Sequence, residues 1–299
     1  MPADPARTPR RRKAAAAADI DCATAFQAMA LGCVAGIEAH HSSACAGDAE
    51  AVHQIRVAIT RLRAAVAFFA PIVVDAEWLR LKKEIAWLNG PLGAARDSDV
   101  VVEYSRRKRY SPWAQRMIGR RLEQRQMLDH RRLVRRLRSA RTQRLVTAIA
   151  RWIRRGPWLE RYGRSKNKEA LLGYCTRELG RWHKRLVRKG RHLKALETSS
   201  LHRLRIKAKR FRYMLEALRE TDAMLGRDEF QQLHRPTKQL QRTLGDLRDI
   251  ERFVDHADRS PSKNGKAAGK HPPGYRRRTE KLLDAAIAAH RDLKRAGAS

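Results

Sequence analysis

The sequence predicts an all-α protein, and three observations support this. Ala, Leu and Arg dominate the chain, only 6% of residues are aromatic, and β-branched runs bounded by turns are scarce. Two stretches that begin at His53 and His202 place polar and apolar residues at helical spacing. These stretches also resemble each other, which indicates an internal repeat. We therefore expect two bundles of about four helices each, related by a pseudo-twofold axis.

The first bundle is expected over residues 20–155, after a basic tail at 1–19 whose composition predicts disorder. Asp48 is the predicted N-cap of its second helix, and Pro71 is expected to stop that helix. The sequence Asn89-Gly90-Pro91 is expected to kink or split the next helix. The predicted helices cover 21–46, 49–70, a segment from Asp75 onward, and a single long stretch over 114–154.

The second bundle is expected over 168–299, after a linker at 156–167 that begins with Gly156-Pro157. Thr198, Ser199 or Ser200 is the predicted cap of the helix that contains His202. Residues 259–275 are rich in Lys, Gly, Ser and Pro, which predicts a disordered loop. The predicted helices cover 168–196, a segment ending near 220, a segment from Asp228 that bends at Pro236, and 277–295.

Basic stripes lie beside the apolar stripes of the two repeated helices. His53, Arg56, Thr60 and Arg63 fall on one helical face, next to a face that carries Ile55, Ile59 and Leu62. The second helix repeats the polar stripe with His202, Arg205, Lys209 and Arg212. A freely solvated face would lie opposite the core, so this position indicates cations held at the edge of a bundle and directed at an anion.

A second pair of markers follows in the same order. Arg96-Asp97-Ser98-Asp99 continues the seam of the helix that follows Asp75, and Gly93 precedes it where a helix or ligand could approach closely. Arg248-Asp249-Ile250-Glu251 stands in the same place in the second half. His53 and His202 are 149 residues apart and Arg96 and Arg248 are 152 apart, so the two halves differ little in length.

The charge balance points to an anionic partner. Lys and Arg number 66 against 31 acidic residues, which gives a formal net charge of +35 over 299 residues. Such a charge destabilises a compact state by self-repulsion, and a bound nucleic acid, acidic membrane or other polyanion would relieve it. High solubility alone explains a moderate excess of basic residues but hardly one of this size.

The four cysteines are Cys22, Cys33, Cys45 and Cys175, and none forms a CxxC pair. This arrangement is neither a disulfide framework nor a zinc pattern, so a reducing cytoplasm fits best. The apolar segment after the basic tail is too short for a signal peptide. We expect no stretch with the length of a membrane span and therefore no membrane partner.

The marker blocks resemble the CHAD family, the histidine-containing α-helical domain associated with inorganic polyphosphate. The first half is similar to its N-terminal signature at His53–Arg63 and Trp87–Asp99, and the second half to its C-terminal signature at Leu201–Glu216. The similarity covers roughly residues 21–295. The resemblance implies two four-helix bundles around a central basic pore, with polyphosphate as the ligand.

The resemblance also implies the ligand-binding positions. Thr60 stands where the first repeat usually has a base, and Ala86 stands opposite Lys238, so the first half would grip the ligand less symmetrically. Lys82 and Lys83, one turn before Ala86, are candidates to supply the missing charge. The predicted polyphosphate-binding residues are His53, Arg56, Arg61, Arg63, Lys82, Lys83, Arg96, His202, Arg205, Lys209, Arg210, Arg212, Lys238 and Arg248.

These residue types suit a polyphosphate chain, which offers dense charge and no bases. Guanidinium groups bind phosphate oxygens in pairs, and lysine supplies a point charge. The stripes carry almost no aromatic platform of the kind that binders of single-stranded nucleic acid use. Asp97, Asp99, Asp249 and Glu251 are then expected to orient the arginines, with solvated helix-end charges as the alternative.

Other interpretations of these residues remain open. His53 and His202 could be ordinary residues near a helix start, and Glu38-x-x-His41 and Glu50-x-x-His53 have the spacing of di-iron carboxylate bundles. The second half has no such pair, so we expect no metal and no cofactor. The segment between Arg116 and Arg155 holds fourteen arginines against two acids, and it is either a solvated face or part of the site.

The sequence lacks the motifs of the common enzyme classes that act on phosphates or esters. It contains no GxxxxGK[ST], GxGxxG, GxSxG or HExxH, and no alternating Glu-x-Glu-x-Lys of triphosphate-tunnel enzymes. We therefore expect a non-catalytic polyphosphate-binding protein in the cytoplasm, with targeting to polyphosphate granules as a hypothesis. The alternative is a sequence-independent nucleic-acid-binding protein, and the oligomeric state is left open.

Overall fold

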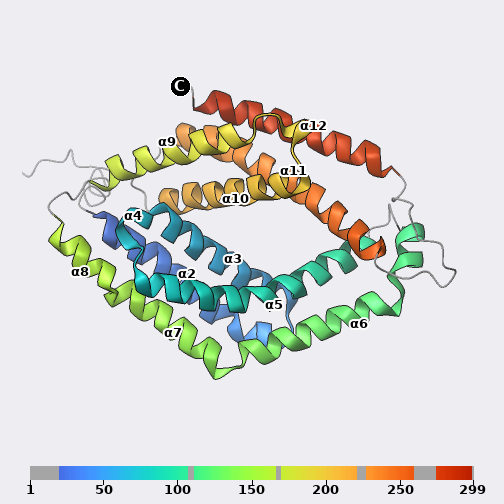
Figure 1. The fold of residues 1–299 in the computed structure, drawn as a ribbon, viewed down its shortest axis with the longest axis horizontal. Helices are drawn as coiled ribbons and strands as arrows, with labels where there is room; N and C mark the ends of the chain where they lie inside the picture. Colours follow the sequence, from blue (N-terminus) through green and yellow to red (C-terminus); the bar gives the residue numbers. More distant parts are fainter. Residues whose placement is uncertain (1–19, 107–110, 166–169, 221–226, 259–273, 298–299) are drawn as a thin grey trace, which may run out of the picture.

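The computed structural model describes residues 20–106, 111–165, 170–220, 227–258 and 274–297, and their regular structure is helical throughout. The predicted all-α class is therefore confirmed. The predicted tail at 1–19 and most of the predicted loop at 259–275 lie outside the described residues. Figure 1 shows the helices of the first half along one side of the molecule and α9 to α12 along the other. The helices of the first half are α2 (Cys22–Cys45), α3 (Ala49–Phe68), α4 (Ala70–Val73), α5 (Ala76–Arg106), α6 (Ser111–Leu137), α7 (Ala140–Arg155) and α8 (Pro157–Arg164).

The start of each of the first two helices is capped by an aspartate. Asp21 accepts a hydrogen bond from the Thr24 backbone N–H, and Asp48 accepts one from the Glu50 backbone N–H. Each carboxylate satisfies a backbone donor that has no partner inside the helix. The predicted N-cap at Asp48 is therefore confirmed, and α3 ends at Phe68, before Pro71.

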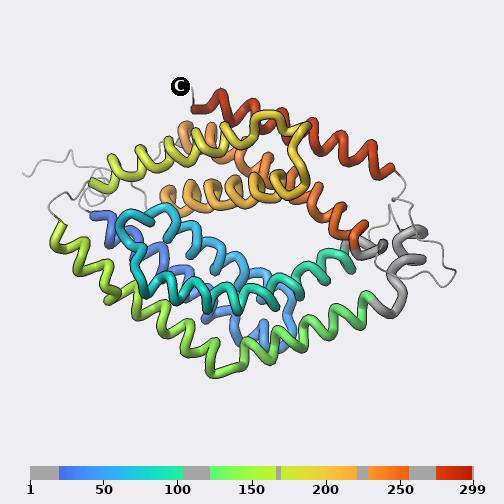
Figure 2. The backbone as a smooth tube through the Cα atoms, viewed as in Figure 1, coloured from blue at the N-terminus to red at the C-terminus, as the bar shows by residue number. Residues whose placement is uncertain are grey.

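The single long helix predicted over 114–154 is wrong. Ser139 has an extended backbone, and its side chain accepts from the Thr142 backbone N–H, so it caps a new helix. Figure 2 shows the sharp turn of the chain between α6 and α7. The consequence is that α7 packs against α2 and α5, whereas α6 pairs with α5.

The segment predicted as a linker is partly helical and takes part in the core. Trp158 of α8 is completely buried, and its ring packs edge-on against Phe26 at a centroid distance of 5.3 Å. Tyr174 of α9 stacks on Phe69 at 5.4 Å and donates a hydrogen bond from its hydroxyl to the Phe68 carbonyl oxygen at 2.8 Å. An aromatic cluster thus joins the first half to the start of the second.

The second half consists mainly of four long helices. The helix α10 begins at Thr198, so Thr198, Ser199 and Ser200 all lie in its first turn. None of the three precedes the helix, as the predicted N-cap would. Among the described elements, α10 packs on α3 and α11 packs on α5, and these contacts join the halves. The elements are α9 (Leu171–Lys189), the short 3₁₀ helix η2 (Leu193–Ala195), α10 (Thr198–Glu220), α11 (Arg227–Asp258) and α12 (Tyr275–Ala296).

Two prolines lie inside long helices without ending them. Pro91 lies within α5 and Pro236 within α11, and both helices continue past the proline. Splitting at Asn89-Gly90-Pro91, one of the two predicted outcomes, therefore does not occur. This continuity matters because Arg96 and Arg248 both follow these prolines on the same helix, and the helix carries them to the boundary between the halves.

The expectation that no stretch has the length of a membrane span requires a correction. The 24 residues of α2 are long and apolar enough to cross a membrane by length and composition. In the structure, however, one face of α2 packs in the core through Phe26, Val34 and Ile37. Its apolar composition therefore has a sufficient explanation in packing against α3 and α7.

Candidate functional site

The polar stripes of α3 and α10 lie next to buried apolar residues, as their spacing predicts. Ile55, Ile59 and Leu62 are buried on α3, and Leu204 and Phe211 are buried on α10. The structure brings basic residues from these two helices together with others from α5 and α11. We call this set the central cluster, and it comprises His53, Arg56, Arg96, His202, Arg205, Lys209, Arg248 and Arg252.

Arg56 and Arg205 occupy matching positions in the two repeats. The Arg56 guanidinium donates to the carbonyl oxygens of Leu92 and Gly93, at 3.3 and 3.5 Å. A Cβ atom added at Gly93 would lie 3.8 Å from Arg56 Nη1, and one added at Gly245 would lie 3.3 Å from Arg205 Nε. Each arginine side chain therefore passes over a glycine of the neighbouring helix, which makes room for it.

Basic groups from both halves interact at the centre. Burial lowers the pKa of Arg56, and the nearby charges of Arg252, Arg205 and Arg96 lower it further against the opposing effect of Asp97. Lys209 is affected more strongly, because burial and the charges of Arg205, Arg56 and Arg212 lower its pKa to about 7. The unliganded cluster is thus a region of unfavourable like-charge contact, which an anion would relieve.

The two histidines that start the stripes are in similar environments. Burial lowers the pKa of His53, and the charge of Arg96 adds to this effect. Burial likewise lowers the pKa of His202, with Arg248 as its largest charged influence. The Nδ1 atoms of both rings are buried and have no hydrogen-bond partner among the described residues. Near pH 7 both rings are therefore neutral in the free protein, and a neighbouring anion would favour their protonated form.

Acidic residues hold part of the cluster in place. Asp97 of α5 forms an ion pair with Arg252 of α11 at 2.8 Å, so this contact crosses between the halves. Burial raises the pKa of Asp249, although the charges of Arg205 and Arg252 oppose the rise. Arg252 was missed by the sequence analysis. It lies one helical turn after Arg248, and this i, i+4 spacing is the signal that could have revealed it.

The two remaining acids of the marker blocks have different partners. Glu251 forms an ion pair with Arg248 at 3.3 Å and accepts a hydrogen bond from the Thr198 hydroxyl at 3.1 Å, which fits an orienting role. Asp99 does not orient Arg96 in this way. It binds His130 at 2.8 Å and Gln126 at 2.9 Å, both on α6, because it faces the α5–α6 contact.

Arg61 and Arg212 lie to one side of the central cluster and have a common acidic neighbour. Each forms an ion pair with Glu216 at 3.6 Å, and His234 also binds this carboxylate at 3.0 Å. The Arg61 and Arg212 guanidinium groups also contact the Tyr213 ring, at 5.3 and 4.8 Å from its centroid. The charge of these two arginines is therefore partly neutralised.

Arg63 and Arg210 lie together on another side. Burial lowers the pKa of Arg210, and the charge of Arg63 lowers it further. Among the described residues, neither arginine forms an ion pair with a carboxylate. This pair therefore lacks the acidic neighbour that Arg61 and Arg212 share. The 149-residue offset nevertheless makes Arg210 equivalent to Arg61 and Arg212 equivalent to Arg63.

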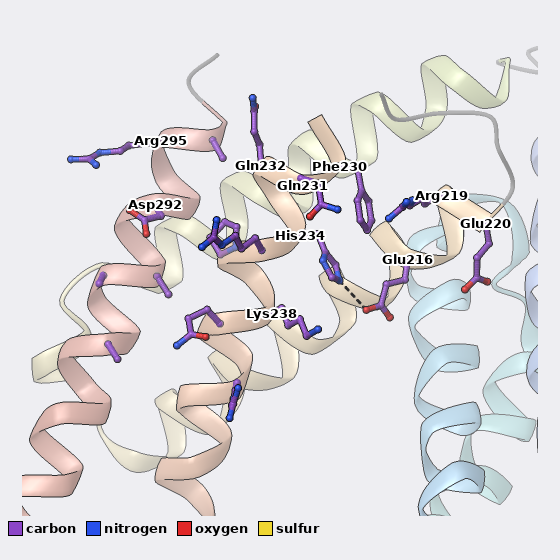
Figure 3. A pocket seen from close by; sticks show the side chains of 18 residues that line it. Glu216, Arg219, Glu220, Phe230, Gln231, Gln232, His234, Lys238, Asp292 and Arg295 are labelled. Carbon is purple, nitrogen blue, oxygen red and sulfur yellow. Dashed lines mark hydrogen bonds and ion pairs between the residues drawn. The ribbon is translucent and has the colours of Figure 1, made fainter. Parts of the chain in front are cut away.

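Three predicted lysines lie apart from the cluster. Lys238 is exposed and lines a cavity of about 1580 Å³ between α10, α11 and α12, together with Glu216 and His234 (Figure 3). Lys82 and Lys83 are also exposed, on the early part of α5. Within the described part of the chain, no hydrogen bond or ion pair joins either lysine to the central cluster. The structure therefore shows no contact by which Lys82 or Lys83 would supply the charge that is missing at Ala86.

The arginine-rich segment 116–155 spans α6 and α7. Its described arginines have local partners: Arg141 forms an ion pair with Glu84 at 2.8 Å, and the Arg136 guanidinium lies 4.2 Å from the centroid of the Trp87 ring. No described contact joins them to the central cluster. The two Glu-x-x-His pairs with the spacing of di-iron bundles have other partners. His41 binds the Leu137 carbonyl oxygen at 3.0 Å, and Glu50 accepts a hydrogen bond from Gln54.

The structure is all-α, and a basic cluster lies between the helices α3, α5, α10 and α11. Residues 28–258 match the family model of the CHAD domain, so the chain belongs to the CHAD family. The structure is similar to the crystal structure of the CHAD domain from the plant Ricinus communis, with a TM-score of 0.71, 21% identity, and coverage of 92% of this chain and 93% of that one.

A second solved structure, PptA from Streptomyces chartreusis, is also similar. Its TM-score is 0.57 at 14% identity, and the match covers 94% of this chain and all of that one. Identities this low show a shared fold. A search of curated proteins finds no match.

Proposed function

We propose that this chain binds inorganic polyphosphate at the central cluster and does not act on it chemically. The observation that carries the proposal is the meeting of Arg56 from one repeat with Arg205 and Lys209 from the other, half-buried between four helices. The cluster contains more cations than the acids Asp97, Asp249 and Glu251 neutralise, so it favours a ligand of high negative charge density.

Membership of the CHAD family and the chemistry of the side chains support the same ligand. The groups in the cluster are guanidinium, ammonium and imidazole, all of which bind phosphate oxygens. The Tyr213 ring beside the cluster is buried and contacts Lys209 and Arg212, so it is occupied by cations and not available to stack on bases. In a cell, we propose cytoplasmic binding that places the protein on polyphosphate granules.

Competition measurements test the ligand. Long-chain polyphosphate and duplex DNA are offered at equal phosphate concentration and equal salt, and the affinity of the purified chain for each is measured. We expect a clear preference for polyphosphate. Equal affinity would contradict the proposal, and shortening of the polyphosphate in the presence of a divalent metal ion would contradict its non-catalytic part.

A double substitution tests the location. Arg56→Gln with Arg205→Gln removes the paired guanidinium groups, and we expect polyphosphate affinity to fall by at least about 100-fold, because each lost charge-assisted contact contributes about 1.5–3 kcal/mol. The control is Arg154→Gln with Arg155→Gln, which removes the same charge from exposed positions of α7. We expect this control to change affinity less than about threefold, as typical for surface charges.

The second candidate is a sequence-independent nucleic-acid binder, favoured by the net charge of +35 and the exposed arginines of α6 and α7. This function predicts the opposite result. Neutralising the tail and the 116–155 arginines would abolish binding, and the Arg56 and Arg205 substitutions would have little effect.

A further inference from the structure

The two helices that flank α3 and α10 differ sharply in charge. The 149-residue offset between the repeats carries Cys22, the first residue of α2, onto Leu171, the first residue of α9. α2 packs on α3 as α9 packs on α10. Yet α2 contains no Lys or Arg, and α9 contains Arg177, Arg181, Lys184, Arg185, Arg188 and Lys189.

On the α2 side, the route out of the central cluster meets an acidic group. Glu216 forms ion pairs with Arg61 and Arg212, and both are in contact with the Tyr213 ring. A small cavity of about 360 Å³ is lined by Arg61, Tyr213, Glu220 and residues of α2. A polyanion leaving in this direction would therefore meet two carboxylates and an apolar helix.

On the α9 side, the route continues over basic residues. Arg63 of α3 and Arg210 of α10 lie together, and Lys207 is one helical turn before Arg210 on the same helix. Burial lowers the pKa of Lys207, and the nearby charges of Lys189 and Arg185 on α9, which packs against α10, lower it further. Within the described residues, none of these five cations forms an ion pair with a carboxylate. We call Arg63, Lys207, Arg210, Arg185 and Lys189 the α9 track.

The α9 track ends at a cavity that is also lined by basic residues. Arg185 also lines a cavity of about 650 Å³ between α9 and the end of α12. Five other Lys or Arg residues line this cavity, and no carboxylate does. The positions of Arg181, Lys184, Arg185 and Arg188 place them along one side of α9 at helical spacing, so the basic surface is continuous along the helix.

We propose that a polyphosphate chain longer than the central cluster leaves it over the α9 track and not over the α2 side. This inference rests on the proposed function and adds a direction and a length dependence to it. The central cluster binds the first phosphates, and the α9 track binds those that follow. Affinity for long chains therefore exceeds affinity for tripolyphosphate, which the central cluster accommodates alone.

The test removes three exposed cations of the α9 track that contact no acidic partner. The track variant carries Lys207→Gln, Arg185→Gln and Lys189→Gln, and the control variant carries Arg144→Gln, Arg154→Gln and Arg155→Gln on exposed positions of α7. Both lose three charges. Affinities for tripolyphosphate, long-chain polyphosphate and single-stranded DNA are measured over a range of salt concentrations.

We expect the track variant to bind long-chain polyphosphate about tenfold more weakly, with a shallower salt dependence, because fewer counterions are released on binding. Its tripolyphosphate affinity should stay unchanged, which also shows that it is folded. Equal losses in the two variants, or no loss for long chains, would overturn the α9 track alone. A loss confined to DNA would overturn polyphosphate as its occupant. No polyphosphate preference in the unaltered chain would overturn the proposed function as well.

Discussion

The repeated helices α3 and α10 use the same stripe of positions for different purposes. Thr60 of α3 donates its hydroxyl to the Arg56 carbonyl oxygen at 2.7 Å and is satisfied within its own helix. Lys209, at the equivalent position of α10, is half-buried among arginines of α3 and α10. A lysine at position 60 as well would add another like charge to this centre, which costs free energy. The comparison teaches that equivalent positions of α3 and α10 contribute differently to the central cluster.

The equivalent acids of the two marker blocks, Asp99 and Glu251, also differ in their contacts. Substituting them should have the largest effect on the free energy of unfolding. Burial alone would raise the pKa of Asp99, but hydrogen bonds from His130 and Gln126 outweigh it and keep the pKa below its usual value. Asp99→Asn should therefore destabilise the fold by about 2–3 kcal/mol, because it weakens a buried charged contact. Its counterpart Glu251→Gln should cost less than about 1 kcal/mol, because its ion pair is more exposed. Denaturant unfolding measures both.

The pH dependence of the free energy of unfolding tests the role of Asp99 further. The lowered pKa of Asp99 gives a contribution that is present above the unfolded pKa and is lost as pH falls through the folded value. The hydrogen bond to Asp99 raises the pKa of His130, and that contribution is present below the unfolded pKa and is lost as pH rises through the folded value. The difference between unaltered and Asp99→Asn chains should therefore be greatest at mildly acidic pH. A pH-independent difference would show that Asp99 acts by packing alone.

Lys209 provides the next effect, which concerns binding. With a pKa of about 7 in the free protein, Lys209 is charged below pH 7 and largely neutral at pH 9, so binding a polyanion there requires proton uptake. Polyphosphate affinity should fall between pH 7 and 9, by up to about tenfold per pH unit. Burial lowers the pKa values of His53 and His202, so neither ring titrates between pH 7 and 9 in the free protein. Tyr213 also stays neutral, because burial raises its pKa.

Two substitutions at Lys209 separate charge from packing. Lys209→Met should bind more weakly at pH 7 and lose most of the dependence, whereas Lys209→Arg should bind at all pH values with little dependence. Stability gives an independent check. The folded pKa is below the unfolded one, so the cost of the buried charge is greatest below pH 7 and disappears as pH rises toward the unfolded pKa. Lys209→Met should therefore stabilise the free protein most at low pH. An unchanged affinity profile in Lys209→Met would assign the dependence to another group.

The sequence predicted the all-α class because helical periodicity is a local property, visible in residues such as Ile55, Ile59 and Leu62. It also selected Arg56 and Arg205, because a basic stripe beside an apolar stripe limits where those side chains can lie. It missed the break at Ser139, since a serine inside a helical pattern caps a new helix only when the chain turns there. It placed Asp99 among the acids that orient the arginines, because spacing along one helix cannot show that α6 supplies the hydrogen-bond partners of Asp99.

The arrangement of cations around the cluster shows a further limit of spacing. Arg61, Arg63, Arg210 and Arg212 have equivalent positions in two repeats, and from the sequence all four belonged to one site. The structure separates them by their neighbours, because Glu216 lies beside two of them. Glu216 is four residues after Arg212, and its contact with Arg61 depends on the packing of α10 against α3. Such contacts between repeats are not encoded in either repeat alone.

The smallest effect compares Gly93 with Gly245, the glycines under Arg56 and Arg205. Ala is favoured over Gly inside a helix by about 1 kcal/mol, so either substitution would stabilise its helix in open space. At Gly93 the new Cβ would lie at ordinary contact distance, 3.8 Å from Arg56 Nη1. Gly93→Ala should therefore raise the free energy of unfolding by about 0.5–1 kcal/mol and leave polyphosphate affinity unchanged.

At Gly245 the new Cβ would lie 3.3 Å from Arg205 Nε, so the guanidinium must shift by a few tenths of an ångström. Gly245→Ala should therefore gain less stability and weaken polyphosphate binding about threefold, because a displaced guanidinium loses part of its paired contact with phosphate. Thermal unfolding and binding measured on both variants decide the matter. If both glycines tolerate alanine equally in binding, Arg205 is not held in its binding position by α11, and the second repeat positions its arginine no more tightly than the first.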